Sequence, residues 1–213
     1  MKVLVVADIH GCYYTFKRLL HTYWNPEDTL LVQVGDMINK GPHSAKCIKK
    51  GIKLKKKYPH LVYFLLGNHE YILKQNLKKF GVPKGMDATK KDAIRHRLSN
   101  SALMIWVNQL LPFWETPHLH VSHAGIARKT VSPTNLSQED SLIYNRKSLR
   151  NIGKTQIVGH VVQEQGANFN PKENAWHIDG GAFMGNGLSA LLIDYNGKNP
   201  ELITEPTAHK DLK

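Results

Sequence analysis

The stretch Lys-Val-Leu-Val-Val-Ala-Asp-Ile-His-Gly, residues 2–11, decides the fold of this chain. Its first six residues form an almost unbroken apolar run, which is typical of a parallel strand covered on both faces. The run ends abruptly, and Asp8 and His10 then alternate with one apolar residue. Residues two apart in an extended chain point to the same side, so these two side chains are expected to reach a common ligand.

The same succession of an apolar run and a polar turn recurs along the chain. It predicts strands at residues 2–7, 29–34, 61–66, 118–122, 155–158, 176–179 and 188–194. Amphipathic stretches predict helices at 13–23, 44–57, 70–80 and 101–111, and a helix with a loop at 137–150. Residues 163–175 are expected to form a polar loop. Strands that alternate with helices indicate an α/β layered fold.

The length of 213 residues fits one domain, and we expect a single domain over residues 1–213. Residues 81–100 combine glycine, proline and basic residues and are a candidate lid or cap insertion. The chain has only two cysteines, Cys12 and Cys47, so no disulfide framework is expected. No apolar run is long enough to cross a bilayer or to act as a signal segment. These features predict a reduced, cytoplasmic protein with no membrane association.

The net charge of +12 and the pI near 9.6 favour anionic partners, such as nucleic acid, nucleotides or phosphorylated surfaces. Much of the excess lies in the lysine-rich run at residues 49–57. That run is either the solvated face of a helix or a basic patch that recruits polyanions. Few aromatic residues are interleaved with it, which weakens the case for nucleic-acid binding.

Polar residues that suit a metal follow five of the predicted strands. They are Asp8 and His10, Asp36, Asn68 with His69, His123, and His160. Ligands in open α/β sheets bind at the carboxyl ends of the strands, where these side chains would meet. Carboxylate, amide and imidazole groups together suit first-row divalent ions. The sequence therefore predicts a site for two metal ions at this edge of the sheet.

These motifs, in this order, resemble those of the calcineurin-like metallophosphoesterases, and specifically of the phosphoprotein phosphatase superfamily. The shared blocks are Asp8-Ile9-His10-Gly11, Gly35-Asp36, Gly67-Asn68-His69-Glu70 and two later histidines, and the likeness extends to the segment 178–181. The resemblance implies an α/β sandwich of two mixed β-sheets flanked by helices, with a dimetal site at the strand ends.

The resemblance also implies six metal ligands: Asp8, His10, Asp36, Asn68, His123 and His160. In this scheme Asp8 and His10 bind the first ion, Asp36 bridges both ions, and the other three bind the second. Manganese is the expected metal, with iron, zinc, nickel or cobalt as alternatives.

Two further residues take catalytic roles by the same resemblance. A hydroxide that bridges the two metals would attack phosphorus in line, as two-metal sites allow. Arg146 and Asn68 would bind the phosphate, and Arg146 would neutralise its charge together with the metals. His69 would act as the general acid that protonates the leaving oxygen.

The chain departs from the protein phosphatases at two places. Asn39-Lys40 stands where those enzymes usually carry Asp-Arg, and Leu66 stands where they carry arginine. These departures resemble the diadenosine tetraphosphate hydrolases and their ApaH-like relatives. Asn39 would orient His69 without stabilising its imidazolium, which predicts a lowered pKa for His69 and weaker acid assistance. Lys40 would contact the substrate as a flexible point charge.

A phosphate leaving group needs little protonation, so the departures favour cleavage of phosphoanhydrides. The expected activity is hydrolysis of dinucleoside polyphosphates, of the bis(5'-nucleosyl)-tetraphosphatase type. One alternative is a serine/threonine or broad-specificity protein phosphatase. A more distant one is a basic nucleic-acid-binding protein with an inactive metal site. The expected partners are thus a dinucleoside polyphosphate, a capped RNA or a phosphoprotein.

Overall fold

The computed structural model describes residues 1–77 and 81–212, and its first sheet is built around the opening stretch of the sequence. The strand order is β10-β9-β1-β2-β3. These strands are β1 (Lys2–Val6), β2 (Thr29–Gln33), β3 (Val62–Phe64), β9 (Leu188–Asp194) and β10 (Glu201–Glu205). The first three run parallel, whereas β9 is antiparallel to β1 and β10 is antiparallel to β9. The sheet is therefore mixed.

The second sheet has the strand order β4-β5-β6-β8-β7. Its strands are β4 (Phe113–Glu115), β5 (Leu119–Ser122), β6 (Thr155–Val158), β7 (Asn168–Asn170) and β8 (Ala175–His177). Strands β5, β6 and β8 are parallel, and the antiparallel strands β4 and β7 close the two edges. This sheet is also mixed, so both sheets agree with the sandwich expected from the sequence.

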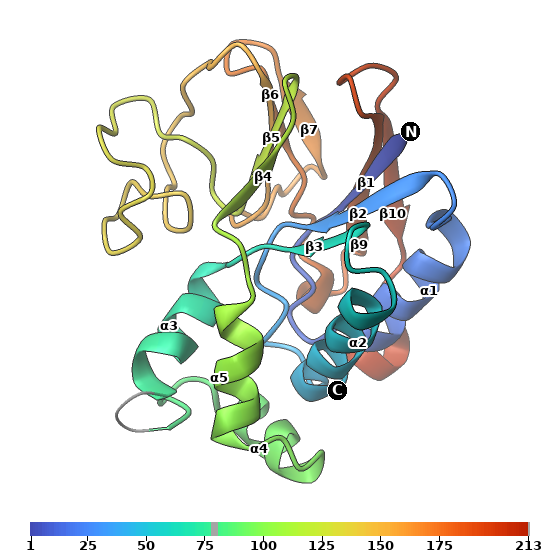
Figure 1. The fold of residues 1–213 in the computed structure, drawn as a ribbon, viewed down its shortest axis with the longest axis vertical. Coiled ribbons are helices and arrows are strands. Elements are labelled where there is room, and N and C mark those ends of the chain that lie inside the picture. Colours follow the sequence, from blue (N-terminus) through green and yellow to red (C-terminus); the bar gives the residue numbers. More distant parts are fainter. Residues whose placement is uncertain (78–80, 213) are drawn as a thin grey trace.

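Five helices lie in the described part of the chain. They are α1 (Tyr13–Tyr23), α2 (Ser44–Lys57), α3 (Asn68–Leu77), α4 (Asp87–Arg95) and α5 (Asn100–Asn108), with short 3-10 turns at Ala182–Met184 and His209–Asp211. Helices α1 and α2 contact the first sheet, whereas α4 packs on α2 and α5 packs on α3. Figure 1 shows α1 and α2 on one side of the first sheet and the second sheet on the other side. Apolar residues of both sheets, including Val5 and Leu191 of the first and Val121 and Ile157 of the second, belong to one buried core. No helix in this described part of the chain has the length and hydropathy needed to cross a bilayer.

The beginning of α1 is stabilised by the other end of the chain. Helix α1 has no capping side chain and no acidic residue in its own first turn. The buried carboxylate of Asp211 accepts hydrogen bonds from the backbone N–H groups of Tyr14 and Thr15 and from the Thr15 hydroxyl. These bonds satisfy donors that a helix start otherwise leaves unpaired.

The predicted helices at 13–23 and 44–57 and the predicted strands at 155–158 and 188–194 have the predicted bounds in the structure. The predicted helix at 70–80 begins earlier, at Asn68, and its last three residues lie outside the described part. The helix expected within the helix-and-loop segment 137–150 is wrong, since this segment forms turns and bends with one isolated bridge from Leu149 to Ala127. The short strands β4, β7 and β10 were not expected, because pairing with neighbours rather than local pattern makes them strands.

Residues 81–100 are more regular than expected, because they contain α4. The helix packs against α2, where the buried Asp92 carboxylate accepts a hydrogen bond from the backbone N–H of Ala45. The buried Thr89 hydroxyl accepts a hydrogen bond from the backbone N–H of Asn39. The segment therefore packs into the body of the domain and supports a predicted site residue, while its role as a lid stays a prediction.

Candidate metal centre

Three of the six candidate metal ligands lie on strained backbone beyond strand ends. His10, Asp36 and His160 have φ angles of 44°, 51° and 68°, in the left-handed region that residues with a Cβ rarely adopt. Asn39 and Lys40 are in the same region, with φ of 71° and 63°. Such strain tends to cluster at functional sites, where the surrounding structure holds it in place.

Two glycines give the carboxylates room. A Cβ on Gly67 would collide with the Asp36 carboxylate, and one on Gly159 would collide with the Asp8 carboxylate. The Gly67-Asn68 and Gly159-His160 turns therefore require glycine so that their backbones can approach the acidic groups closely.

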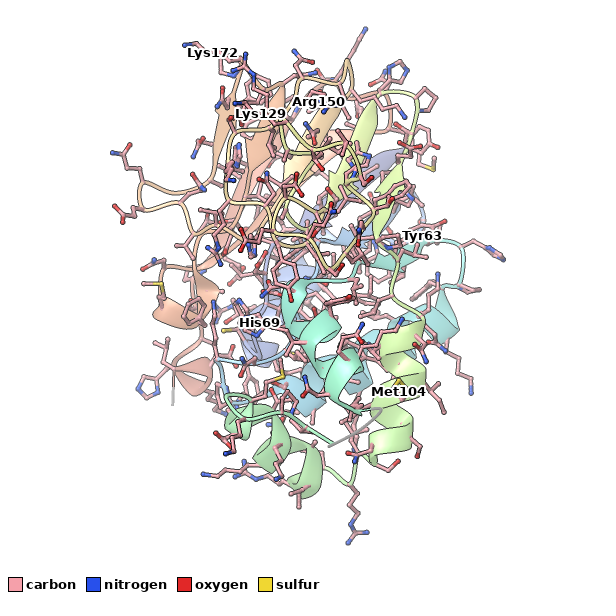
Figure 2. The ribbon with its side chains drawn as sticks, turned by 90° about the vertical axis from the view of Figure 1, so that its left-hand side faces the viewer. Tyr63, His69, Met104, Lys129, Arg150 and Lys172 are labelled. Carbon is pink, nitrogen blue, oxygen red and sulfur yellow. The ribbon has the colours of Figure 1, made fainter. Side chains whose placement is uncertain are left out.

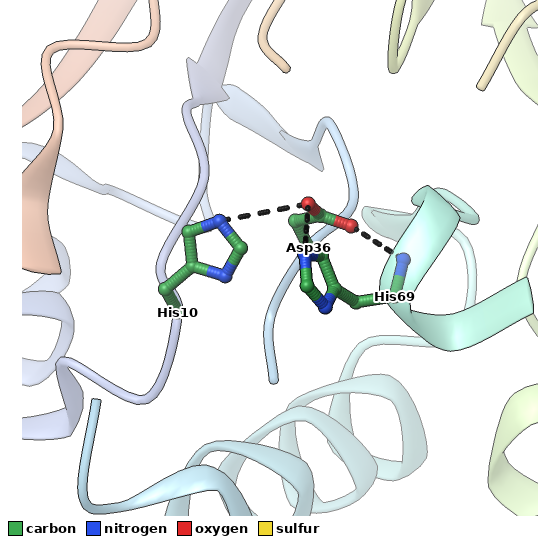
Figure 3. Close-up of side chains that lie close together, drawn as sticks. All are labelled: His10, Asp36 and His69. Carbon is green, nitrogen blue, oxygen red and sulfur yellow. Dashed lines mark hydrogen bonds and ion pairs between the residues drawn. The ribbon is translucent and has the colours of Figure 1, made fainter. Parts of the chain in front are cut away.

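Asp36 lies at the centre of a first cluster with His10 and His69 (Figure 3). Its Oδ2 atom is 3.5 Å from Nε2 of His10 and 3.7 Å from Nε2 of His69. The backbone N–H of His69 also donates to Oδ1 of Asp36, at 3.0 Å. The ligand atoms of the three residues all lie within 4.8 Å of one another.

A second cluster joins the same Asp36 to His123 and His160. Nε2 of His123 is 3.5 Å from Oδ2 of Asp36 and 3.0 Å from Oδ1 of Asn68. All three members of the cluster are buried. Because Asp36 belongs to both clusters, its position suits the bridging role expected from the sequence.

Asp8 is buried beside these clusters but is in neither of them. Its carboxylate accepts a hydrogen bond from the backbone N–H of His160 and lies 4.0 Å from Nδ1 of His123. Its role as a ligand of the first ion stays a prediction. His69, predicted as the general acid, instead falls within the first cluster.

Burial and neighbouring charges shift the pKa values of several groups in the centre. Burial alone would raise the pKa of the Asp36 carboxyl, but His123 above all, with His10 and His69, holds that pKa well below its usual range. Burial lowers the pKa of His10 to about 3 and that of His160 to about 3. Burial also opposes the charged form of His123, yet Asp36 and Asp8 raise its pKa to about 9.

The arrangement of lone pairs tests whether a cation fits this site. Nδ1 of His10 lies 2.9 Å from the Ile38 carbonyl oxygen and donates to it, so Nε2 of the neutral ring carries a lone pair. That lone pair faces the Asp36 carboxylate at 3.5 Å. Two facing lone pairs repel each other unless a cation lies between them. A carbonyl that orients the far nitrogen is also a common feature of metal-binding histidines, so the residues fit a metal ion.

Glu70 holds the loop that carries Asp36, a role that we did not assign from the sequence. The buried Glu70 carboxylate accepts hydrogen bonds from the backbone N–H groups of Gly67, Asp36, Met37 and Ile38. Burial, followed by the Asp36 charge, raises its pKa to about 7. Its place in the Gly67-Asn68-His69-Glu70 block, shortly after the predicted strand 61–66, was the available signal.

Asp179 is a second acidic residue near the centre that the sequence analysis left without a role. It is buried, and burial raises its pKa. After burial itself, the charge of Asp179 is the next cause that raises the pKa of Asp8. It is the last residue of the predicted strand 176–179 and lies just beyond β8, so the rule that located the other acidic groups applied to it as well.

Asn39 and His69 are directly paired. The Asn39 side-chain Nδ2 lies 2.9 Å from Nδ1 of His69. The pKa of His69 is lowered, as expected, although burial is the main cause. The exposed Lys40 places its Nζ 4.1 Å from the centroid of the Phe183 ring. Leu66, at the position of the missing arginine, is buried in the core.

The exposed Arg146 lies close enough to influence the centre. Burial is the largest cause of the lowered pKa of both His69 and His160. The charge of Arg146 is a smaller cause that acts in the same direction. It also lines a surface cavity with Gly159 and Val161, the two neighbours of His160. The structure thus brings Arg146 to the edge of the candidate metal centre.

The fold and this centre agree with the comparison with known families, in which the profile for calcineurin-like phosphoesterases matches residues 1–182. The chain therefore belongs to the calcineurin-like phosphoesterase family. Two solved structures share its fold, each with a TM-score of 0.70. One is a candidate diadenosine tetraphosphatase, 24% identical, in an alignment that covers 98% of this chain and 94% of that one. The other is a Saccharomyces cerevisiae protein serine/threonine phosphatase similar to human PP5, 16% identical, with coverage of 98% and 84%.

Curated relatives carry more specific names. A symmetrical bis(5'-nucleosyl)-tetraphosphatase of Buchnera aphidicola (subsp. Schizaphis graminum) is 32% identical over 136 residues, which cover 61% of this chain and 46% of the relative. An asymmetrical bis(5'-nucleosyl)-tetraphosphatase of Halalkalibacterium halodurans is 26% identical over 166 residues, which cover 68% and 65%. The chain thus spans about half the length of the symmetrical enzymes that it matches.

Proposed function

We propose that this chain is a dimetal-dependent phosphohydrolase that cleaves phosphoanhydride bonds in dinucleoside polyphosphates or related nucleotides. The observation that carries the proposal is the pairing of the Asn39 amide with His69 beside the Asp36 clusters. The names of the tetraphosphatase relatives support the same substrate class.

The residues proposed to hold the ions are Asp8, His10, Asp36, Asn68, His123 and His160. Two divalent ions, when bound, would acidify a water molecule and neutralise charge on the phosphate oxygens. Manganese is the proposed metal. His10 and His160 already have pKa values of about 3, so they present neutral rings at physiological pH. His123 has a raised pKa and must release a proton when it binds a metal.

His69 is proposed to handle the proton of the leaving group. Because the Asn39 amide donates to Nδ1 of His69, the proton of the neutral ring sits on Nε2. A neutral imidazole is a weak acid, so this group would assist an alkoxide leaving group poorly. A phosphate leaving group has a second pKa of about 6 and departs with little help. The amide partner therefore suits anhydride cleavage.

Arg146 and Lys40 are proposed to bind the substrate's phosphates. Both are exposed cations at the edge of the centre. Arg146 offers a planar fork for two phosphate oxygens, whereas Lys40 offers a single point charge. The buried Leu66 supplies no second fork. Arg146 and Lys40 would therefore hold a terminal phosphate monoester less rigidly than two arginines would. They would also leave room for a polyphosphate chain that continues beyond the phosphate bound at the centre.

The decisive experiment compares three substrates with the same enzyme and Mn²⁺: diadenosine tetraphosphate, a phosphoserine peptide and an RNA with a nucleotide cap. We expect kcat/KM for diadenosine tetraphosphate to exceed that for the peptide by at least about tenfold. A preference for the peptide would establish the protein phosphatase alternative instead. If neither these substrates nor an aryl phosphate turned over with any divalent metal, the chain would not be a phosphohydrolase.

The cellular setting is also a proposal. Cys12 and Cys47 are free and buried, and burial raises the pKa of both thiols, which disfavours their reactive thiolate forms. The protein therefore needs no oxidising compartment, and we propose that it acts in the cytoplasm.

A further inference from the structure

Three adjoining cavities lie along the loops around the second sheet. The first, of about 360 Å³, is lined by Arg146 and Lys147 and by residues of β7 and β8. The second, of about 420 Å³, shares Asn170 and Glu173 with the first. The third, of about 460 Å³, shares Lys147 and Ser148 with the first. Because they share walls, the cavities form one continuous surface, which we call the basic groove.

Six cations give the groove its charge: Arg128, Lys129, Arg146, Lys147, Arg150 and Lys172. They come from three separate parts of the sequence. Figure 2 shows Lys129, Arg150 and Lys172 near one another at one end of the molecule, with His69 closer to its middle. A run of like charges on one surface attracts a polyanion and raises its local concentration.

The protein's own acidic groups do not neutralise these cations. Within the described part of the chain, the only lysine or arginine ion pairs join Arg18 to Glu205 and Lys154 to Glu115, outside the groove. Two acidic residues, Glu173 and Asp140, line the groove beside these cations. Glu173 is already engaged, since it accepts hydrogen bonds from the Leu149 backbone and from His177. Arg150 donates to the carbonyls of Arg128 and Thr130 and so stabilises the groove wall.

One end of the groove lies beside the candidate metal centre. Arg146 lines the first cavity, as do Gly159 and Val161 on either side of His160. A ligand bound at the metal centre that continues past Arg146 would enter this cavity. From there the shared walls lead toward Lys129 and Lys172.

The lining favours a nucleic-acid backbone over separate bases or a bare phosphate chain. Among the described residues that line the three cavities, none is phenylalanine, tyrosine or tryptophan, so the groove offers contacts to phosphates and sugars rather than the aromatic platform of single-strand binders that stack bases. Ser148, Asn151 and Asn170 add hydroxyl and amide groups beside the cations. Cations mixed with such groups are the usual contacts to phosphates and sugars.

We propose that the basic groove binds the phosphate backbone of a nucleic-acid strand whose end reaches the candidate metal centre. The part of this proposal in which the strand's end is positioned for cleavage rests on the proposed function. Binding of the strand in the groove does not depend on that function. Recognition through the backbone depends little on base sequence and strongly on salt.

The lysine-rich run of α2 is a different surface and serves as the control. Lys49 and Lys55 donate to backbone carbonyls, and Lys57 lies 5.0 Å from the centroid of the Tyr58 ring. None of the three cavities of the groove includes an α2 residue. Neutralising three of these lysines changes the net charge as much as neutralising three groove cations does.

The test measures the fluorescence anisotropy of a labelled 12-nucleotide single-stranded RNA at several salt concentrations, without added metal. The groove variant is Arg128→Gln with Lys129→Gln and Lys172→Gln, and the matched control is Lys53→Gln with Lys56→Gln and Lys57→Gln. We expect the groove variant to bind about tenfold or more weakly than the control at low salt. The slope of log K against log salt should fall in magnitude by about 2, because single strands contribute about 0.7 per phosphate contact.

Equal losses in the two variants, or no loss in the groove variant, would overturn the proposal. The proposal would also be overturned if the protein bound linear inorganic polyphosphate but not the RNA. The groove would then be a site for free polyphosphate. Diadenosine tetraphosphate turnover by the groove variant should stay within about twofold of wild type. If the wild type did not turn over that substrate, the proposed function would fail while the binding result would stand.

Discussion

The side-chain amide nitrogen of Asn39 lies 2.9 Å from Nδ1 of His69. The sequence suggested this pairing, and the structure shows the contact that makes it chemically meaningful. An amide orients the imidazole but supplies no negative charge to stabilise its protonated form. The backbone N–H of Asn39 is in turn held by Ser44 and Thr89, so the pair is fixed from both α2 and α4.

Restoring a carboxylate and a guanidinium should shift substrate preference. In the double variant Asn39→Asp with Lys40→Arg, the new carboxylate beside His69 stabilises the imidazolium. The planar guanidinium of arginine, which can bind two phosphate oxygens, replaces the single ammonium of Lys40. We expect the ratio of phosphoserine-peptide to diadenosine tetraphosphate kcat/KM to rise about tenfold. The ratio is measured with both substrates on one enzyme preparation. The single variant Lys40→Arg is the control, and an unchanged ratio in the double variant would contradict this account of the pair.

Removing His69 should affect poor leaving groups most. General acid catalysis typically contributes about 10²- to 10⁴-fold. Because Asn39 leaves His69 a weak acid, we expect losses below this range. His69→Asn should lower kcat for a phosphoserine peptide by about tenfold and kcat for diadenosine tetraphosphate by about threefold or less. The exposed His60 offers the matched variant His60→Asn, which should leave both rates unchanged. Equal losses for the two substrates would show that His69 does not act on the leaving group.

Asp36 should control metal affinity, because it belongs to both clusters. Manganese at about 100 times its dissociation constant should raise the free energy of unfolding of the wild type by about 2.7 kcal/mol. We expect Asp36→Asn to lose most of this stabilisation and to bind Mn²⁺ at least about 100-fold more weakly by calorimetry. Asp87→Asn, at an exposed position of α4, is the control. Wild-type metal affinity in the Asp36 variant would exclude the bridging role.

The link between Asp211 and α1 should contribute to stability alone. Its buried carboxylate receives two backbone hydrogen bonds and one from a hydroxyl. We expect Asp211→Ala to lower the free energy of unfolding by about 2 kcal/mol in urea denaturation, since helix caps are worth up to about that amount. Asp211→Asn keeps one acceptor oxygen and should lose about half as much. A variant as stable as the wild type would show that α1 needs no cap from the C-terminal segment.

Much of the fold and the centre follows from local sequence. A buried parallel strand must be apolar along its length, so a carboxylate or imidazole at its end is conspicuous, as with Asp8 and Asp36. Strand ends meet at one edge of a sheet, which is why residues as distant as Asp36 and His160 could be expected together. The clusters confirm that Asp36 lies with both His10 and His160.

Local sequence predicted less where contacts between distant segments determine the structure. Helix α4 follows a stretch with Gly81, Pro83 and Gly85 that predicts irregular chain, yet its contacts with α2 stabilise it. The role of Glu70 depends on four backbone donors converging on one carboxylate, which only the folded loop provides.

The sequence by itself indicated the class of this protein, because polar residues that follow apolar strands meet at one sheet edge and their ordered motifs resemble those of a known family. Only the tertiary structure decided which side chains touch and where the charge gathers. The lysine-rich run of α2 stands out in the sequence because its charges are consecutive. The cations of the basic groove are scattered between residues 128 and 172 and become one surface only when the loops around the second sheet fold together.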